Sequence, residues 1–184
     1  MAQPQATPLN DLLRNCKDGN LQFQELLYKQ FYGYALGVAS RYLINKEDAL
    51  EVVNDSFIKV FKSLHTFRED ADFKAWFRKI LVNTSLDHKR RNMRFNQAIE
   101  MVDTEVQTTY HSAIDQLSAK DILHLMKNLN ETQHLVFNLY EIDGYSHKEI
   151  GEMLNIPESS SRTYLTRAKQ ALKSLLSNYS IYTR

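Results

Sequence analysis

Apolar residues recur at three- and four-residue steps along most of the chain, which is the spacing that buries one face of an α-helix. A short first helix is expected around Leu9, Leu12 and Leu13. Three longer stripes follow. Their apolar members are Phe23, Leu26, Leu27, Phe31, Ala35, Val38, Ala39 and Tyr42, then Ala49, Leu50, Val52, Val53, Phe57, Val60, Phe61 and Leu64, then Phe73, Trp76, Phe77, Ile80 and Leu81. Three such helices can close a hydrophobic core between them.

The breaks between the stripes carry residues that start and stop helices. Gly19 ends the first helix, and the pattern restarts at Asn45. Asn20 and Asp72 can accept hydrogen bonds from the open backbone N–H groups of the helices that follow them. Only five glycines and three prolines occur in 184 residues, which leaves little turn chemistry for a β fold. The sequence therefore predicts an all-α protein.

The helical periodicity weakens between residues 96 and 113. Glu100, Asp103 and Glu105 lie in this stretch, and no Lys or Arg occurs from residue 96 to residue 118. A polar, acidic segment of this kind buries too little apolar surface to fold by itself. We therefore expect two small helical domains joined by a flexible acidic linker: a tail and first helix at 1–20, a first domain at 21–95, the linker at 96–113 and a second domain at 114–184.

The second domain contains the spacing of a helix-turn-helix. Ser146 and Glu149 form a capping-box pattern at the start of a short helix, residues 155–157 break that helix, and a longer one follows over 158–175. An α-helix fits the major groove of DNA, and its first turns can place side chains against base edges. We expect the reading residues to be Ser159, Ser160, Ser161, Arg162 and Tyr164.

The basic side chains of this helix suit different contacts. Arg162 can donate two hydrogen bonds to a guanine edge, which discriminates between bases by about 1 to 3 kcal/mol. Arg167 and Lys169 are better suited to phosphates. The same pattern also fits a surface helix with an ordinary basic face, so the spacing alone leaves both interpretations open.

Overall charge does not by itself indicate nucleic-acid binding, since the net charge is +1 and the pI is near 7.8. The basic residues are instead concentrated, as in the run of Lys89, Arg90, Arg91 and Arg94. That run also fits a solvated helix end. The single cysteine, Cys16, excludes an internal disulfide and a multi-cysteine zinc site, and we expect no metal and no cofactor. The absence of a leader pattern and of a long apolar run predicts a cytoplasmic protein that does not insert into membranes.

Longer motifs in both halves of the chain resemble one known family. The second half, with GYSHKEIG at 144–151 and the basic helix after it, resembles region four of bacterial RNA polymerase sigma factors. The first half, with DALEVVNDSFIKVF at 48–61 and FKAWFRKILVN at 73–83, resembles region two of the same family. The two-domain layout is similar to that of the extracytoplasmic function (ECF) group of the sigma-70 family. The resemblance implies an initiation subunit that is not itself an enzyme.

The resemblance also implies roles for particular residues. In sigma factors the segment that contains Asp48, Glu51, Asn54 and Asp55 docks on a coiled coil of the polymerase β′ subunit. The loop that begins with Phe67 and Arg68 and ends at Asp72 accepts a flipped base of the minus ten promoter element, and Asn83 borders that pocket. Lys79, Lys89, Arg90 and Arg91 would hold strand phosphates.

Region four reads the minus thirty-five element, and the implied partners are core RNA polymerase through its β′ and β subunits, promoter DNA and an anti-sigma protein. This sequence departs from the family pattern at Ser159, Ser161 and Tyr164, where a glycine, a valine and a second arginine are common. Phe67 has two interpretations. It either stacks on the flipped base, which would offset part of the cost of unpairing, or anchors the loop.

Two other function classes compete with this interpretation. A helix-turn-helix transcriptional regulator would use its N-terminal half for dimerisation or ligand sensing, and its 48–61 segment would not bind polymerase. A metal enzyme could use the Glu-x-x-His pattern of Glu131 and His134. A paired-metal site needs a second copy of that motif, and Glu131 is explained more simply as a residue in the first turn of a capped helix.

Overall fold

A computed structural model of the protein describes residues 8–99, 126 and 129–181, with side chains for 8–92, 126 and 129–174. The chain divides into two compact units, residues 1–101 and 102–184, and each is described by itself. Helices and their connections make up the whole of the described ranges, which confirms the predicted all-α class. Within those ranges, no helix combines the length and the apolar character needed to cross a membrane.

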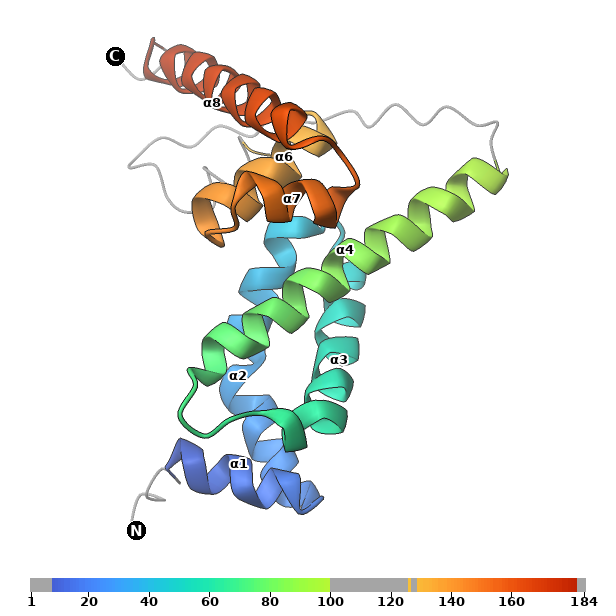
Figure 1. The fold of residues 1–184 in the computed structure, drawn as a ribbon, viewed down its shortest axis with the longest axis vertical. Coiled ribbons are helices and arrows are strands. Elements are labelled where there is room, and N and C mark those ends of the chain that lie inside the picture. The colour runs from blue at the N-terminus through green and yellow to red at the C-terminus, as the bar shows by residue number, and fades with distance from the viewer. Residues whose placement is uncertain (1–7, 100–125, 127–128, 182–184) are drawn as a thin grey trace. The chain divides into compact units, whose positions relative to one another are not determined.

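Unit 1 is built from four α-helices, three of which correspond to the predicted stripes (Figure 1). They are α1 (Leu9–Lys17), α2 (Leu21–Tyr42), α3 (Lys46–Ser63) and α4 (Phe73–Ile99), with a short 3-10 helix η1 (Leu64–Thr66) after α3. The side chains of Asn20, Asn45 and Asp72 accept hydrogen bonds from the backbone N–H groups of Gln22, Glu47 and Lys74. The starts of α2, α3 and α4 are therefore each closed by a local side chain, whereas α1 begins after Pro8 without a side-chain cap.

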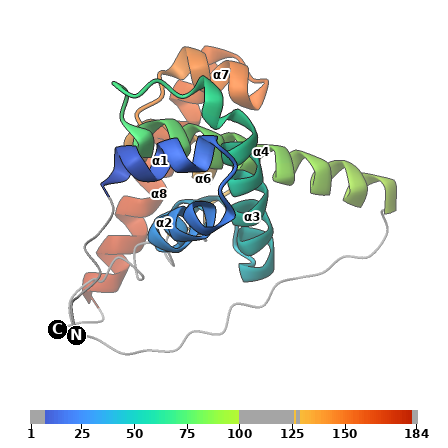
Figure 2. The same cartoon turned by 90° about the horizontal axis from the view of Figure 1, so that it is seen from below.

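The core of unit 1 lies where α2, α3 and α4 meet, and aromatic rings fill it. Phe77 lies 4.9 Å from Phe57 and 5.8 Å from Phe73, measured between ring centroids, and Phe73 lies 4.9 Å from Phe31. All four rings are buried. Such contacts contribute beyond simple area burial, and they fix the helices against one another. Helix α1 crosses the start of α2 and adds its own apolar face to this core (Figures 1 and 2).

Helix α1 contributes Leu12, Leu13 and Cys16, all of them buried. Burial raises the pKa of the Cys16 thiol to about 11, because the apolar surroundings penalise the thiolate. Cys16 is therefore a packing residue in the first helix.

Unit 2 is a smaller helical unit that ends in two helices joined by a tight turn. Its elements are α6 (Glu131–Phe137), the π-helical segment η2 (Asn138–Ile142), α7 (His147–Leu154) and α8 (Glu158–Ile181). Val136, Leu139, Ile150, Leu165 and Ala168 form its core together with Met126. The capping box predicted between Ser146 and Glu149 is present in both directions. The pairing of α7 with α8 is the helix-turn-helix that the spacing predicts.

The predicted linker at 96–113 overlaps the end of α4, which continues to Ile99. Local helical preference therefore outlasts the apolar stripe by at least one turn. The rest of the predicted linker, and most of the helix expected after residue 114, lie outside the described residues.

Candidate functional site

Four polar residues of α3 form the first candidate surface, here called the acidic face: Asp48, Glu51, Asn54 and Asp55. Their spacing of three, three and one residues places them away from the buried stripe of the same helix. Glu51 and Asn54 are exposed, and Asp48 and Asp55 are half-buried. The hydroxyl of Tyr28 on α2 donates a hydrogen bond to Asn54 Oδ1 at 3.1 Å. The residues implied by the resemblance therefore share one surface of unit 1.

A buried histidine on α4 supports this acidic face. His88 Nε2 lies 3.4 Å from Asp48 Oδ1, and its Nδ1 lies 3.6 Å from Glu51 Oε1. Further along the seam, Arg91 Nη2 lies 3.7 Å from Asp55 Oδ2. The sequence reasoning missed His88, although its position seven residues after the buried Leu81 predicts that it faces inward.

The loop between η1 and α4, residues 67–72, carries the second candidate surface. Phe67 is only 5% exposed, and its ring lies 5.7 Å from that of Phe73 and 5.2 Å from that of Trp76. Arg68 pairs with Asp70 at 2.7 Å within the loop. Of the two interpretations of Phe67, this conformation matches the loop anchor, because the ring faces of an exposed base platform would have to be free. The hydrophobic neighbours on α4 draw the ring inward.

Lys79 and Asn83 lie one turn apart on α4, and both are exposed. Asn83 borders a shallow hollow of about 450 Å³ between α3 and α4, whose lining residues are Lys59, Lys62, Ser63, Ile80, Asn83 and Thr84. Lys59 Nζ donates to Thr84 Oγ1 at 3.0 Å. This hydrogen bond holds the Lys59 ammonium group at the rim of the hollow. No residue of loop 67–72 lines this hollow.

The basic run at the middle of α4 is engaged within unit 1. Arg90 pairs with Asp87 at 2.8 Å, and Arg91 pairs with Asp55 as described above. Lys89 is half-buried. For these side chains to hold strand phosphates, Arg90 and Arg91 would have to exchange an acidic partner for a phosphate oxygen. Both pairs are substantially exposed, so the cost of that exchange is small.

Helix α8 presents the third candidate surface, here called the reading face. A shallow hollow is lined by Ser159, Ser160, Thr163, Tyr164 and Arg167. These positions are spaced by four and by one along the helix, so they share one outward side. Four of these residues were predicted from the sequence to contact DNA, and Thr163 was not. The signal for Thr163 was its position one turn after Ser159, and its hydroxyl now donates to the Ser159 carbonyl at 3.0 Å.

Ser161 does not belong to the reading face. The prediction that it contacts DNA is therefore corrected. The residue is fully buried, and its hydroxyl shares a hydrogen bond of 2.9 Å with Nδ1 of His147 on α7. It lies one turn before the buried Leu165 and two turns before the buried Ala168, so helix geometry directs it into the core. The polar side chain is accepted there because His147 satisfies its hydroxyl.

His147 links the two helices of the motif. Its ring stacks on Tyr140 of η2 with centroids 4.3 Å apart and an interplanar angle of 19°. Burial, and then the positive charge of Arg162, lower the pKa of His147 below its usual value. The neutral imidazole is thus the form that fits between Tyr140 and Ser161.

Two of the predicted DNA-contacting cations are held by acidic neighbours. Arg162 Nη2 lies 2.5 Å from Glu158 Oε1 one turn earlier on α8, and Lys169 Nζ lies 2.6 Å from Glu141 Oε1 of η2. Arg162 and Lys169 are seven residues apart and so share one side of α8, and neither of them lines the hollow of the reading face. Arg162 would have to leave Glu158 to reach a guanine edge.

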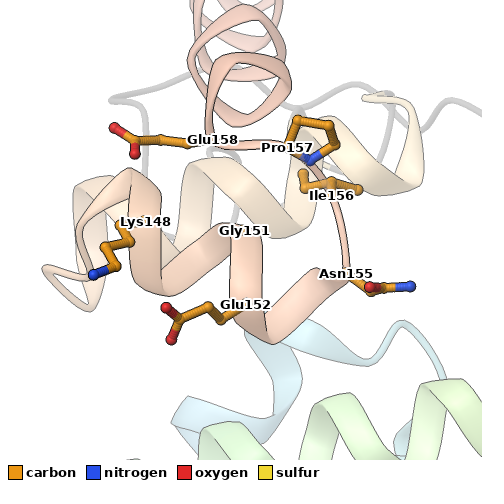
Figure 3. A pocket seen from close by; sticks show the side chains of 7 residues that line it. All are labelled: Lys148, Gly151, Glu152, Asn155, Ile156, Pro157 and Glu158. Carbon is orange, nitrogen blue, oxygen red and sulfur yellow. The ribbon is translucent and has the colours of Figure 1, made fainter.

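The turn between α7 and α8 depends on a glycine (Figure 3). Helix α7 ends at Leu154 and is capped by Asn155, which has the left-handed φ of 54°, and the N–H of Ile156 donates to the Gly151 carbonyl at 3.0 Å. A Cβ atom built on Gly151 would lie 2.8 Å from the Ile156 carbonyl oxygen. The absence of a side chain at Gly151 is what lets α8 begin so close to α7.

The described residues contain no group of three or more His, Cys, Asp or Glu side chains arranged to hold a metal ion. Glu131 lies exposed in the first turn of α6, and His134 is buried one turn later. Asn130 caps this helix by accepting from the N–H of Thr132.

Comparison with known proteins identifies both halves. The family described as Sigma-70 region 2 matches residues 27–95, and the family described as Sigma-70, region 4 matches residues 119–172. The ECF RNA polymerase sigma-E factor of Haemophilus influenzae is 25% identical over 174 residues, covering 88% of this chain and 92% of that protein. The protein of the same name from Escherichia coli K12 is 24% identical over 173 residues, covering 88% and 90%.

A solved structure of a sigma factor, RpoE from Bartonella quintana in complex with the anti-sigma factor NepR, has a similar fold. It covers 83% of this chain and 96% of that one, with a TM-score of 0.58 and 19% identity.

The chain belongs to the sigma-70 family of RNA polymerase sigma factors. Within that family it is a member of the ECF group, whose proteins act in promoter-specific transcription initiation. Sigma factors are initiation factors rather than enzymes, and their regions 2 and 4 bind core RNA polymerase and promoter DNA. The regulator alternative is not favoured, because region 2 occupies the half of the chain in which a sensing or dimerisation domain was required.

Proposed function

We propose that the three surfaces divide the work of initiation between them. The acidic face of α3 docks on the β′ subunit of core RNA polymerase, with β contributing to the remaining interface. Loop 67–72 and Asn83 capture an unpaired base of the minus ten element. The reading face of α8 contacts the minus thirty-five duplex. The observation that carries the proposal is the outward side of α8, where hydroxyl and guanidinium groups gather beside a helix that braces it.

The reading face suits a duplex because its groups lie on a rigid helix. Ser159, Ser160 and Thr163 are small hydroxyl residues that allow the helix backbone to approach the groove closely. Tyr164 and Arg167 extend further, and Arg167 has the length and charge to reach a phosphate.

The acidic face suits a protein partner better than it suits DNA. Its carboxylates would repel a phosphate backbone, whereas they complement a basic protein surface. His88 and Arg91 support two sides of the face from α4, so its shape is held before any partner arrives. A preformed surface loses less conformational entropy on binding.

We also propose that an anti-sigma protein binds this chain and competes with polymerase. The support is the fold shared with the Bartonella quintana sigma factor, which is described in complex with its anti-sigma factor. Binding to core RNA polymerase would place the chain in the cytoplasm.

Binding to purified bacterial core RNA polymerase tests the proposal. The full chain, labelled for fluorescence anisotropy, should bind core enzyme, and Glu51→Lys should weaken that binding at least roughly tenfold because it reverses an exposed charge on the acidic face. The holoenzyme should then select promoters from a random-sequence DNA library.

The matched control is Glu25→Lys, which reverses another exposed carboxylate, on α2 and paired with Lys29. This variant should bind core enzyme like the unaltered chain. Absence of core binding by the unaltered chain, or equal losses in the two variants, would contradict the proposal.

A further inference from the structure

We propose that α1 is a positioning element for loop 67–72, and that Arg14 and Lys17 hold this loop in the shape that receives the unpaired base. This inference rests on the proposed function of the loop. Helix α1 precedes the segment that matches sigma region 2, which begins at residue 27, so this role belongs to a part of the chain that the family match does not cover.

The contacts between α1 and the loop involve both side-chain and backbone atoms. Arg14 meets Glu69 with two parallel hydrogen bonds, Nη2 to Oε2 at 2.9 Å and Nε to Oε1 at 3.3 Å. Lys17 Nζ donates to the carbonyl oxygen of Phe67 at 3.2 Å, in a partly buried position, and lies 4.0 Å from Glu69 Oε1. A forked arginine contact fixes direction as well as distance, so two points of the loop are set by one helix.

Helix α1 can serve as a fixed support because its opposite face is buried. Leu12, Leu13 and Cys16 anchor it in the core of unit 1, whereas Arg14 and Lys17 lie on the side toward the loop. The loop itself is fixed from within by the buried ring of Phe67. The loop is therefore held between the aromatic core and α1.

The charge arrangement also suits a nucleic-acid strand. An isolated carboxylate in a loop that meets DNA would repel the phosphates. Arg14 and Lys17 bring two positive charges to Glu69, and the hydrogen bond and charge of Arg14 lower the pKa of Glu69 below its usual value. Glu69, whose charge could otherwise disturb strand binding, is thus the residue through which α1 holds the loop.

A double-mutant cycle in the complete holoenzyme tests the inference. The promoter is one selected from a random library by the unaltered holoenzyme, and strand opening is followed with a fluorescent base analogue in the minus ten element. Arg14→Gln should slow opening roughly threefold in the unaltered background and should have no further effect in a Glu69→Gln background, because the coupling has already been removed. Base preference at the minus ten element should relax in both single variants.

Three comparisons make the outcome decisive. Arg14→Lys should recover part of the opening rate, since it restores the charge without the fork. Lys29→Gln, which removes an exposed cation paired with Glu25 on α2, should open promoters normally. Equal slowing by Arg14→Gln in both backgrounds would mean that Arg14 contacts DNA directly, and no slowing in either would mean that α1 does not position the loop. Either result overturns the inference, whereas failure of the unaltered holoenzyme to open any promoter would overturn the proposed function instead.

Discussion

The two candidate DNA surfaces are built on opposite plans. On α8 the reading face lies outside the core, and the buried residues Ser161 and Leu165 are on the other side of the helix. In unit 1 the residue that opens loop 67–72, Phe67, is itself a core residue. Recognition and stability are thus carried by different residues in unit 2 and by shared residues in unit 1. A duplex groove can be read by a rigid helix without rearrangement, whereas a loop that must hold a single base needs support from beneath.

The strongest test of this difference is Phe67→Ala. Removing a buried phenyl ring from the contact with Phe73 and Trp76 should lower the free energy of unfolding of unit 1 by about 3 kcal/mol, because a cavity remains. Urea unfolding followed by tryptophan fluorescence reports on this unit, since Trp76 is the only tryptophan in the sequence. Asn83→Ala is the control and should leave stability within about 0.5 kcal/mol, because that side chain is exposed. Similar stabilities for both variants would show that Phe67 is not a core residue.

The second test compares the same chemical change in the two units. Gly151→Ala should lower the stability of unit 2 by about 1 to 3 kcal/mol, since its Cβ atom would meet the Ile156 carbonyl oxygen and push α7 from α8. Gly37→Ala, inside α2 with open space around the added methyl group, should instead stabilise unit 1 by about 0.5 to 1 kcal/mol. Thermal unfolding of each variant, followed by circular dichroism, measures both effects. If Gly151→Ala left the stability of unit 2 unchanged, the turn between α7 and α8 would have room to relax around the added methyl group.

The smallest effect concerns pH and the contact between the two helices of the motif. His147 has a lowered pKa in the folded chain, so the unfolded chain binds the proton first as the pH falls. Its contribution to stability is therefore fully present above about pH 6.5, the ordinary value, and is lost as the pH falls below it. The charged groups near its ring are Arg162, Glu158 and Lys169.

His147→Gln keeps a hydrogen-bond partner for Ser161 but does not titrate. The unfolding free energy of unit 2, measured by denaturant titration between about pH 7.5 and about pH 5.5, should fall more steeply in the unaltered chain than in this variant. Parallel curves for the two proteins would show that protonation of His147 does not contribute. Unit 1 in the same samples serves as an internal reference through Trp76.

The helices and most of their caps could be predicted from the sequence, because apolar stripes and helix caps depend on residues only a few positions apart. Asn20, Asn45 and the capping box at Ser146 are examples. Such local patterns could not predict contacts between distant segments. Arg14 and Glu69 are 55 residues apart in sequence, and nothing in the spacing of either one indicates the other. The burial of Phe67 likewise depends on where α4 places its aromatic side chains.

Helix geometry could have improved the prediction on α8. Ser161 precedes Leu165 by one turn and Ala168 by two, so it shares their buried side, whereas Thr163 follows Ser159 by one turn and shares its exposed side. The set of DNA-contacting residues predicted at the start of α8 therefore combined exposed positions with the buried position of Ser161. The family pattern contained a hint as well, because an apolar valine at the position of Ser161 suits a buried site.

The buried thiol in α1 gives the chain a practical property. Because Cys16 is enclosed and its thiolate is scarce at neutral pH, maleimide reagents should leave it unmodified under native conditions. A cysteine introduced on the exposed surface of either unit could then carry a dye without first removing the natural one. Pairs of such dyes would make the spacing between the two units on polymerase directly measurable by energy transfer during initiation.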